Sequence, residues 1–181
     1  MNLNTVSVLG NQTFDYDTDK ISSISAIITS GTTNKVPCQY AVTTMDSRVQ
    51  DLLNTKNINQ ARILTTASLH KKYVFFDRVD ELPLFPFLKG QNDSLESYSE
   101  QFLSLLLGIW MEHKKIYLFG YDIEDLEERS NLINVINNHP HTEIVYVRKP
   151  NPNKIFLFDA YENVSIMDYN DFNEMTNDRT E

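Results

Sequence analysis

Short apolar runs rich in β-branched and aromatic residues recur along the chain, and turn-forming or polar residues close each run. Runs of this kind predict β-strands. We place strands at residues 5–9, 24–29, 39–44, 61–65, 73–76, 116–119, 143–147, 154–158 and 164–167. Apolar residues at helical spacing predict helices at 48–54, 93–112 and 124–138. Strands that alternate with helices indicate an α/β domain with a mostly parallel sheet.

We therefore expect a single-domain, Rossmann-like α/β fold with a mostly parallel sheet of about 6–8 strands and flanking helices. A chain of 181 residues suits one domain, which we place at residues 1–168. The strands around 154–167 are expected to form an antiparallel edge. Residues 169–181 are expected to be a polar, acidic tail, either a short helix or frayed.

The predicted helix at 93–112 is apolar around almost its whole circumference, which is typical of a buried helix. Asp93 is its predicted N-cap, with Glu96 three residues later. Gly108 is expected to allow close approach to a strand.

An apolar loop precedes this helix; it begins at Leu82 and ends at Leu88. Pro83 and Pro86 exclude a regular helix or a central strand there. The loop must pack on something, so we expect a lid, a pocket wall or the contact of a homo-oligomer.

Composition excludes several classes of function. The net charge of −9 disfavours nucleic-acid binding, because an acidic surface repels phosphates. Five glycines form neither a dinucleotide-binding fingerprint nor a phosphate-binding P-loop. Cys38 is the single cysteine, which excludes an internal disulfide and a multi-cysteine zinc site. We expect no metal site from His139 and His141, since a third ligand is lacking nearby.

No window approaches the roughly 18 apolar residues of a membrane span, and no secretory signal is visible. We therefore expect a cytoplasmic protein without a membrane span.

Three predicted strands end in residues suited to a binding site. The carboxyl ends of parallel strands meet at one edge of a sheet, where ligands bind. A glycine admits a close ligand, and an asparagine amide, a carboxylate or an arginine can hold a phosphate or a ribose. The candidate binding residues are Gly10, Asn11, Asp46, Ser47, Arg48 and Gly120. Each also has a structural interpretation: turn glycines, and an N-cap at Asp46 or Ser47.

Asp122 is the candidate catalytic residue. It follows Gly120 at a predicted strand end, where it suits a general base or a hydroxyl ligand. The alternative is that it caps the acidic helix that follows.

Three segments together resemble bacterial sialyltransferases and the related 6-hydroxymethylpterin pyrophosphokinase-like proteins. They are V-S-V-L-G-N, A-V-T-T-M-D-S-R and L-L-L-G-I-W-M-E-H-K-K-I-Y-L-F-G-Y-D-I. The chain departs from that family in two places. The family's Gly-Pro-Ser is replaced by Gln12-Thr13-Phe14, and its Ser-Gly before the central helix by Asn92-Asp93-Ser94.

The resemblance implies a glycosyltransferase-like protein that binds a nucleotide-activated sugar of the CMP-sugar type. Gly10 and Asn11 would contact the nucleotide, Asp46 and Arg48 would line the crevice, and Asp122 would orient the acceptor or act as base. Acidic side chains at the same edge would repel a diphosphate unless Mg²⁺ bridged them. These side chains are Asp15, Asp17, Asp19, Asp122, Glu124 and Asp125. The alternatives are a non-catalytic interaction or oligomerising protein that keeps the fold, and a pterin-type pyrophosphokinase.

Overall fold

A computed structural model describes residues 4–10, 16–30, 36–55, 60–86, 88, 94–121, 126–149 and 161–177. These residues form one eight-stranded sheet with the order β5-β4-β3-β2-β1-β6-β7-β8. All neighbouring strands run parallel. The strands are β1 Thr5–Leu9, β2 Ala26–Ser30, β3 Tyr40–Val42, β4 Arg62–Thr65, β5 Val79–Glu81, β6 Lys115–Phe119, β7 Glu143–Arg148 and β8 Val164–Asp168. The predicted Rossmann-like α/β class is confirmed.

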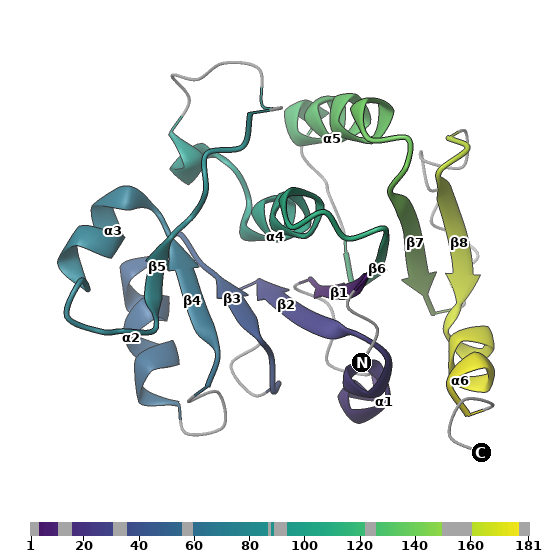
Figure 1. The fold of residues 1–181 in the computed structure, drawn as a ribbon, viewed down its shortest axis with the longest axis horizontal. Coiled ribbons are helices and arrows are strands. Elements are labelled where there is room, and N and C mark those ends of the chain that lie inside the picture. The colour runs from purple at the N-terminus through teal and green to yellow at the C-terminus, as the bar shows by residue number, and fades with distance from the viewer. Residues whose placement is uncertain are drawn as a thin grey trace.

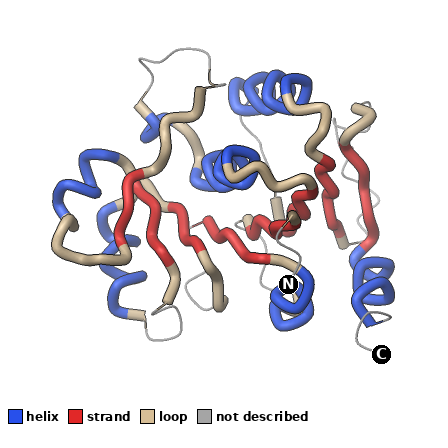
Figure 2. The backbone as a smooth tube through the Cα atoms, in the orientation of Figure 1, coloured by secondary structure: helices blue, strands red, loops and turns tan. Residues whose placement is uncertain are grey.

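The direction of chain travel across the sheet reverses at β1. The chain first moves from β1 outward to β5, and β6 then pairs with the other side of β1. Val8 in β1 thus lies between Ile28 in β2 and Leu118 in β6. Figure 2 shows the twisted sheet that results, with β1 near its middle. Such a reversal opens a crevice beyond the carboxyl ends of the two central strands.

Helices cover both faces of the sheet. In Figure 1, α4 and α5 lie on one side, and α1 and α6 lie on the other. Each side has its own apolar core, with Phe102 and Leu106 in the first and Ile21 and Phe172 in the second. The helices are α1 Thr18–Ile24, α2 Asp46–Asn54, α3 Ala67–Lys72, α4 Glu100–Trp110, α5 Leu126–Asn138 and α6 Tyr169–Asn177.

The central helix α4 is buried, as its composition predicts. Every side chain from Phe102 to Ile109 is buried, whereas Trp110 at its end is 47% exposed. Burial of each large apolar side chain contributes roughly 1.5–3 kcal/mol. Gly108 does allow close approach, since a Cβ there would lie 3.3 Å from side-chain carbons of both Val6 and Ile116.

Helix starts differ from the prediction. Residues 95–97 form a separate 3₁₀ helix, and α4 begins at Glu100 with Ser99 as N-cap. Ser99 accepts a hydrogen bond from the Phe102 amide, as a helix N-cap should. The predicted cap at Asp93 lies outside the described residues. For α2 the N-cap is Met45, without a side-chain cap bond, so the predicted caps Asp46 and Ser47 are wrong.

Two elements on the β5 side of the sheet were predicted incorrectly. Residues 73–76 are a turn after α3 and not a strand, and Phe75 in that turn is 91% exposed. The edge strand is β5 (Val79–Glu81), which is short and acidic and so carries little strand signal. No helix was predicted at the position of α1. Asp17 starts it by accepting hydrogen bonds from the amides of Asp19 and Lys20.

The C-terminal region also differs from the prediction. Strand β8 is parallel to β7, so the predicted antiparallel edge is wrong for the described residues. The predicted strand at 154–158 lies outside them. The tail forms helix α6, which is one of the two predicted alternatives, and its Phe172 is fully buried.

The loop after β5 packs mainly on its own domain. Leu82 and Phe85 are buried in the core that α4 and α5 cover, and Leu84 is 85% exposed.

Candidate functional site

Gly10 and Gly120 meet at the carboxyl edge of the two central strands. The Gly10 amide donates to the Phe119 carbonyl at 2.8 Å. A Cβ on Gly10 would lie 2.5 Å from the Gly120 carbonyl oxygen and against the Gln101 side-chain oxygen. Gly120 has a φ of 56°, in the left-handed region that favours glycine. Both glycines are site residues predicted from the sequence, and the fold places them side by side at the reversal point.

The N-terminal turn of α4 lies against Gly10. Gln101 lies in its first turn and its amide oxygen borders Gly10. The backbone and hydroxyl of Ser99, the N-cap, donate to the Glu128 carboxylate of α5. A helix N-terminus carries partial positive charge, so anions bind favourably there. No sequence signal marked Gln101, because a glutamine inside an apolar helix is not unusual.

Glu100 is a buried carboxylate that no sequence pattern indicated. It is 7% exposed and accepts hydrogen bonds from the Thr43 hydroxyl at 2.6 Å and the Thr44 amide at 3.0 Å. Arg48 completes the set with an ion pair to the same carboxylate. Charge-assisted bonds of this kind offset the cost of burying a charge. Arg48 therefore lies near the sheet edge, but its charge is balanced by Glu100.

Asp46 is directed toward α3. Its carboxylate accepts from Lys72 Nζ at 2.7 Å and from the Tyr73 hydroxyl at 2.8 Å. These two hydrogen bonds hold the pKa of Asp46 below its usual value. β3, which precedes Asp46, is two strands away from β1, a separation of about 10 Å. Ser47 is exposed in the first turn of the same helix.

Tyr16 lies beside the glycine pair, on the β7 side. Its hydroxyl is 3.5 Å from the Val147 carbonyl, and its ring packs edge-on against Phe119 at 5.4 Å. Burial is the main cause of its raised pKa, while backbone hydrogen bonds of Gly120 and Lys149 act in the opposite direction. The phenol therefore lies between the ends of β6 and β7. An aromatic residue in a polar loop offered no pattern by which to assign it to the site.

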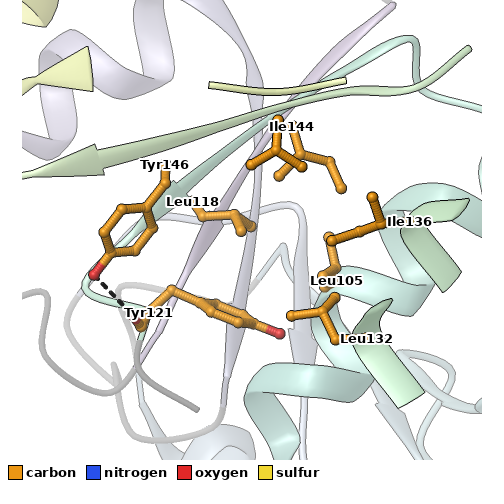
Figure 3. Close-up of a pocket in the computed structure, with 8 residues that line it drawn as sticks. Leu105, Leu118, Tyr121, Leu132, Ile136, Ile144 and Tyr146 are labelled. Carbon is orange, nitrogen blue, oxygen red and sulfur yellow. Dashed lines mark hydrogen bonds between the residues drawn. The ribbon is translucent and has the colours of Figure 1, made fainter. Parts of the chain in front are cut away.

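A small apolar cavity lies behind the edge, under α5 (Figure 3). Its volume is about 10 Å³, at the lower limit of what one water molecule requires. The Tyr121 ring enters it, and its hydroxyl has no hydrogen-bond partner among the described residues. The backbone carbonyl of Tyr121 is held by the Tyr146 hydroxyl at 2.9 Å. A cavity of this size cannot hold a nucleotide or a sugar.

Two predicted residues cannot be placed. Asn11 and Asp122 lie outside the described residues. Of the acidic side chains considered for Mg²⁺, Asp17 is used as the N-cap of α1. Within the described ranges, no three histidine, cysteine, aspartate or glutamate side chains form a group that could hold a metal.

No protein-family model matches the chain, and no curated protein matches its sequence. In the part of the chain that the structure describes, no helix combines the length and the apolar character that crossing a membrane requires.

Proposed function

We propose that the protein binds a nucleotide-activated sugar of the CMP-sugar type at the carboxyl edge between β1 and β6, and that it is glycosyltransferase-like. The observation that carries this proposal is the contact of Gly10 with Gly120 at the reversal point of a parallel sheet. Open α/β sheets bind ligands at this position. Gly120 is partly exposed there, and the buried Gly10 holds the end of β1 against it.

The roles of the site residues follow from their positions. Gly10 and Gly120 lie at the reversal point, and we assign them to nucleotide contact together with Asn11, which follows Gly10 in the sequence. Ser47 and Arg48 border the site on the β3 side, where the Arg48–Glu100 ion pair offers hydrogen bonds to neutral hydroxyl groups of a sugar. The Asp46 carboxylate is bonded to Lys72 and Tyr73 at the end of α3, so we assign Asp46 no direct contact with the ligand.

Thermal melting with added CMP, CDP or UDP, each with and without Mg²⁺, tests the binding. A nucleotide at 100 times its dissociation constant stabilises the folded state by about 2.7 kcal/mol, which raises the melting temperature. If no nucleotide changes the melting temperature at millimolar concentration under either condition, the proposal is wrong.

Asp122 is the proposed catalytic group. Removing a general base slows turnover by about 10²–10⁴-fold, so Asp122→Asn should abolish measurable sugar transfer or hydrolysis while nucleotides still raise the melting temperature. Asp51→Asn, an exposed change on α2, is the matched control and should leave turnover unchanged. Equal activity of the Asp122→Asn variant and the wild type would remove Asp122 from the mechanism.

A non-catalytic interaction protein is the second candidate, and one surface favours it. The turn after α3 exposes three adjacent apolar side chains: Val74 by 55%, Phe75 by 91% and Phe76 by 49%. Exposed apolar clusters mark contact surfaces in many proteins. The loop after β5 fits this role less well than the sequence indicated, since Phe85 there is buried.

The solution mass of the protein tests this candidate. If the turn forms a homo-oligomer, the wild type is larger than a monomer, and Phe75→Ser returns it to monomer mass. Leu84→Ser is the control, because Leu84 is a similarly exposed apolar residue after β5. A monomeric wild type, or a Phe75→Ser variant of unchanged mass, would exclude self-association through this turn.

A further inference from the structure

A nucleotide at this edge requires a nearby positive charge, because its phosphate must approach a protein of net charge −9. Arg48 lies near this edge in an ion pair with the buried Glu100 carboxylate.

Lys149 is a cation at the correct edge. It directly follows β7 and is exposed. Its Nζ lies 5.7 Å from the centre of the Tyr16 ring, within the range of a cation–π interaction. A ring face orients an ammonium group and leaves it positively charged. Lys149 therefore brings an oriented positive charge to the edge where the phosphate would bind.

Tyr16 is fixed in place by its own contacts. Its ring packs edge-on against Phe119 at 5.4 Å and against Tyr169 at 4.7 Å. The Tyr169 hydroxyl in turn accepts a hydrogen bond from the Asp17 amide at 2.6 Å. A ring held from two sides restricts the lysine above it, and a restricted lysine loses less entropy when it binds a ligand.

The Tyr16 ring also connects Lys149 to the glycine pair. Its hydroxyl lies close enough to the backbones of Gly120 and Lys149 for both to lower its pKa. Gly120 in turn lies against Gly10. Tyr16 thus lies between Lys149 and Gly120 at the ends of β6 and β7.

We propose that Lys149 and Tyr16 form the phosphate subsite of this edge: Lys149 Nζ contacts the phosphate group of a nucleotide, and Tyr16 is the positioning residue that orients Lys149. This inference rests on the proposed nucleotide binding. It predicts that the affinity for the phosphate depends on the ring of Tyr16 and not on its hydroxyl.

Isothermal titration with CMP and with cytidine, which lacks the phosphate, tests the subsite. Lys149→Met should weaken CMP binding by about tenfold, the effect of losing one charge-assisted hydrogen bond, and should leave cytidine binding unchanged. Tyr16→Phe keeps the ring and should bind CMP like the wild type. Tyr16→Leu removes the ring and should weaken CMP binding, as Lys149→Met does.

Lys115→Met is the matched control. Lys115 also lies over a tyrosine ring, 5.3 Å from that of Tyr117, but it begins β6 and so lies at the opposite edge of the sheet. This variant should bind CMP normally.

The possible outcomes separate the two proposals. If the wild type binds CMP and Lys149→Met binds it equally well, the phosphate subsite is wrong and nucleotide binding stands. The phosphate subsite is also wrong if Lys149→Met weakens CMP and cytidine binding equally. If the wild type binds neither compound, both proposals are wrong.

Discussion

Gly10 occupies a position where the protein leaves no room for a side chain. The Gly120 carbonyl and the Gln101 amide fill the space that a Cβ would need. The backbone at the end of β1 is therefore held against the end of β6. A side chain at residue 10 could be accommodated only if one of the two strand ends shifted.

We expect Gly10→Ala to lower the free energy of unfolding by about 1–3 kcal/mol, the usual cost of overpacking. The clash is with a backbone oxygen at 2.5 Å, which cannot rotate away. Urea unfolding measures the effect.

Gly108→Ala is the control for this substitution. Its nearest neighbours are side-chain carbons at 3.3 Å, which can adjust, and alanine favours a helix over glycine by about 1 kcal/mol. If Gly10→Ala is as stable as the wild type, the close approach of the two strand ends is not a rigid feature.

Glu100 provides a second residue-scale prediction. Glu100→Gln removes the charge that Arg48, Thr43 and Thr44 surround, and we expect a loss of about 1–3 kcal/mol in urea unfolding. Asp80→Asn breaks the exposed pair with Arg62 and should cost about 0–1 kcal/mol. Equal losses for the two variants would contradict a special role for burial at Glu100.

At the scale of the element, α6 is part of the domain. Phe172 packs against Phe119 at 5.0 Å and Tyr117 at 5.6 Å, which are both in the central strand β6. The predicted boundary at residue 168 would cut through this contact. The sequence 169–177 is mostly polar, so only one deeply buried aromatic side chain distinguishes it from a free tail.

Phe172→Ala tests whether α6 stabilises the domain. We expect a loss of about 3–5 kcal/mol in the free energy of unfolding, because a fully buried aromatic ring is removed. Glu174→Ala, an exposed change on the same helix, should change it by less than about 0.5 kcal/mol. A negligible effect of Phe172→Ala would restore the interpretation of α6 as a tail.

Strong local patterns made part of the fold predictable. β1, β6 and β7 are apolar, β-branched strands flanked by polar turns, and their predicted positions agree with the structure to within one residue. The failures have physical causes. The apolar run at 73–76 resembles a buried strand, but Tyr73 is its only buried residue. Helix α1 has only Ile21 and Ile24 as apolar residues at helical spacing.

The candidate site was less predictable than the fold. Strand-end position was enough to select Gly10 and Gly120, since parallel strands align their carboxyl ends. Glu100, Tyr16 and Lys149 could not be selected in this way, because their significance depends on contacts between segments far apart in the chain.

At the scale of the whole molecule, stability should fall toward both extremes of pH. The pKa of Asp46 and that of Glu96 are lowered by hydrogen bonds in the folded state, so their contribution is lost as the pH falls through those lowered values. The pKa of Tyr121 is raised well above 10.0, mainly by burial. The unfolded chain therefore loses that proton first, and stability falls as the pH rises above 10.0.

The Tyr121→Phe variant tests how much ionisation of Tyr121 contributes to the loss of stability at alkaline pH. Its hydroxyl is buried without a partner among the described residues, so removing it should not destabilise the protein at neutral pH. Thermal melting at a series of pH values should show a smaller loss above pH 10.0 than in the wild type. If the melting temperatures of the variant and the wild type fall equally above pH 10.0, groups other than Tyr121 cause the loss of stability.

The pairing of β1 with β6 has a consequence for synthesis of the chain. Residue 5 pairs with residue 115, so β1 has no neighbour on that side until β6 has left the ribosome. Until then the strand is an open edge with Val6 and Val8 on it, and such edges promote association between chains. A chain that ends at Lys114 should therefore self-associate in light-scattering measurements more strongly than the full chain.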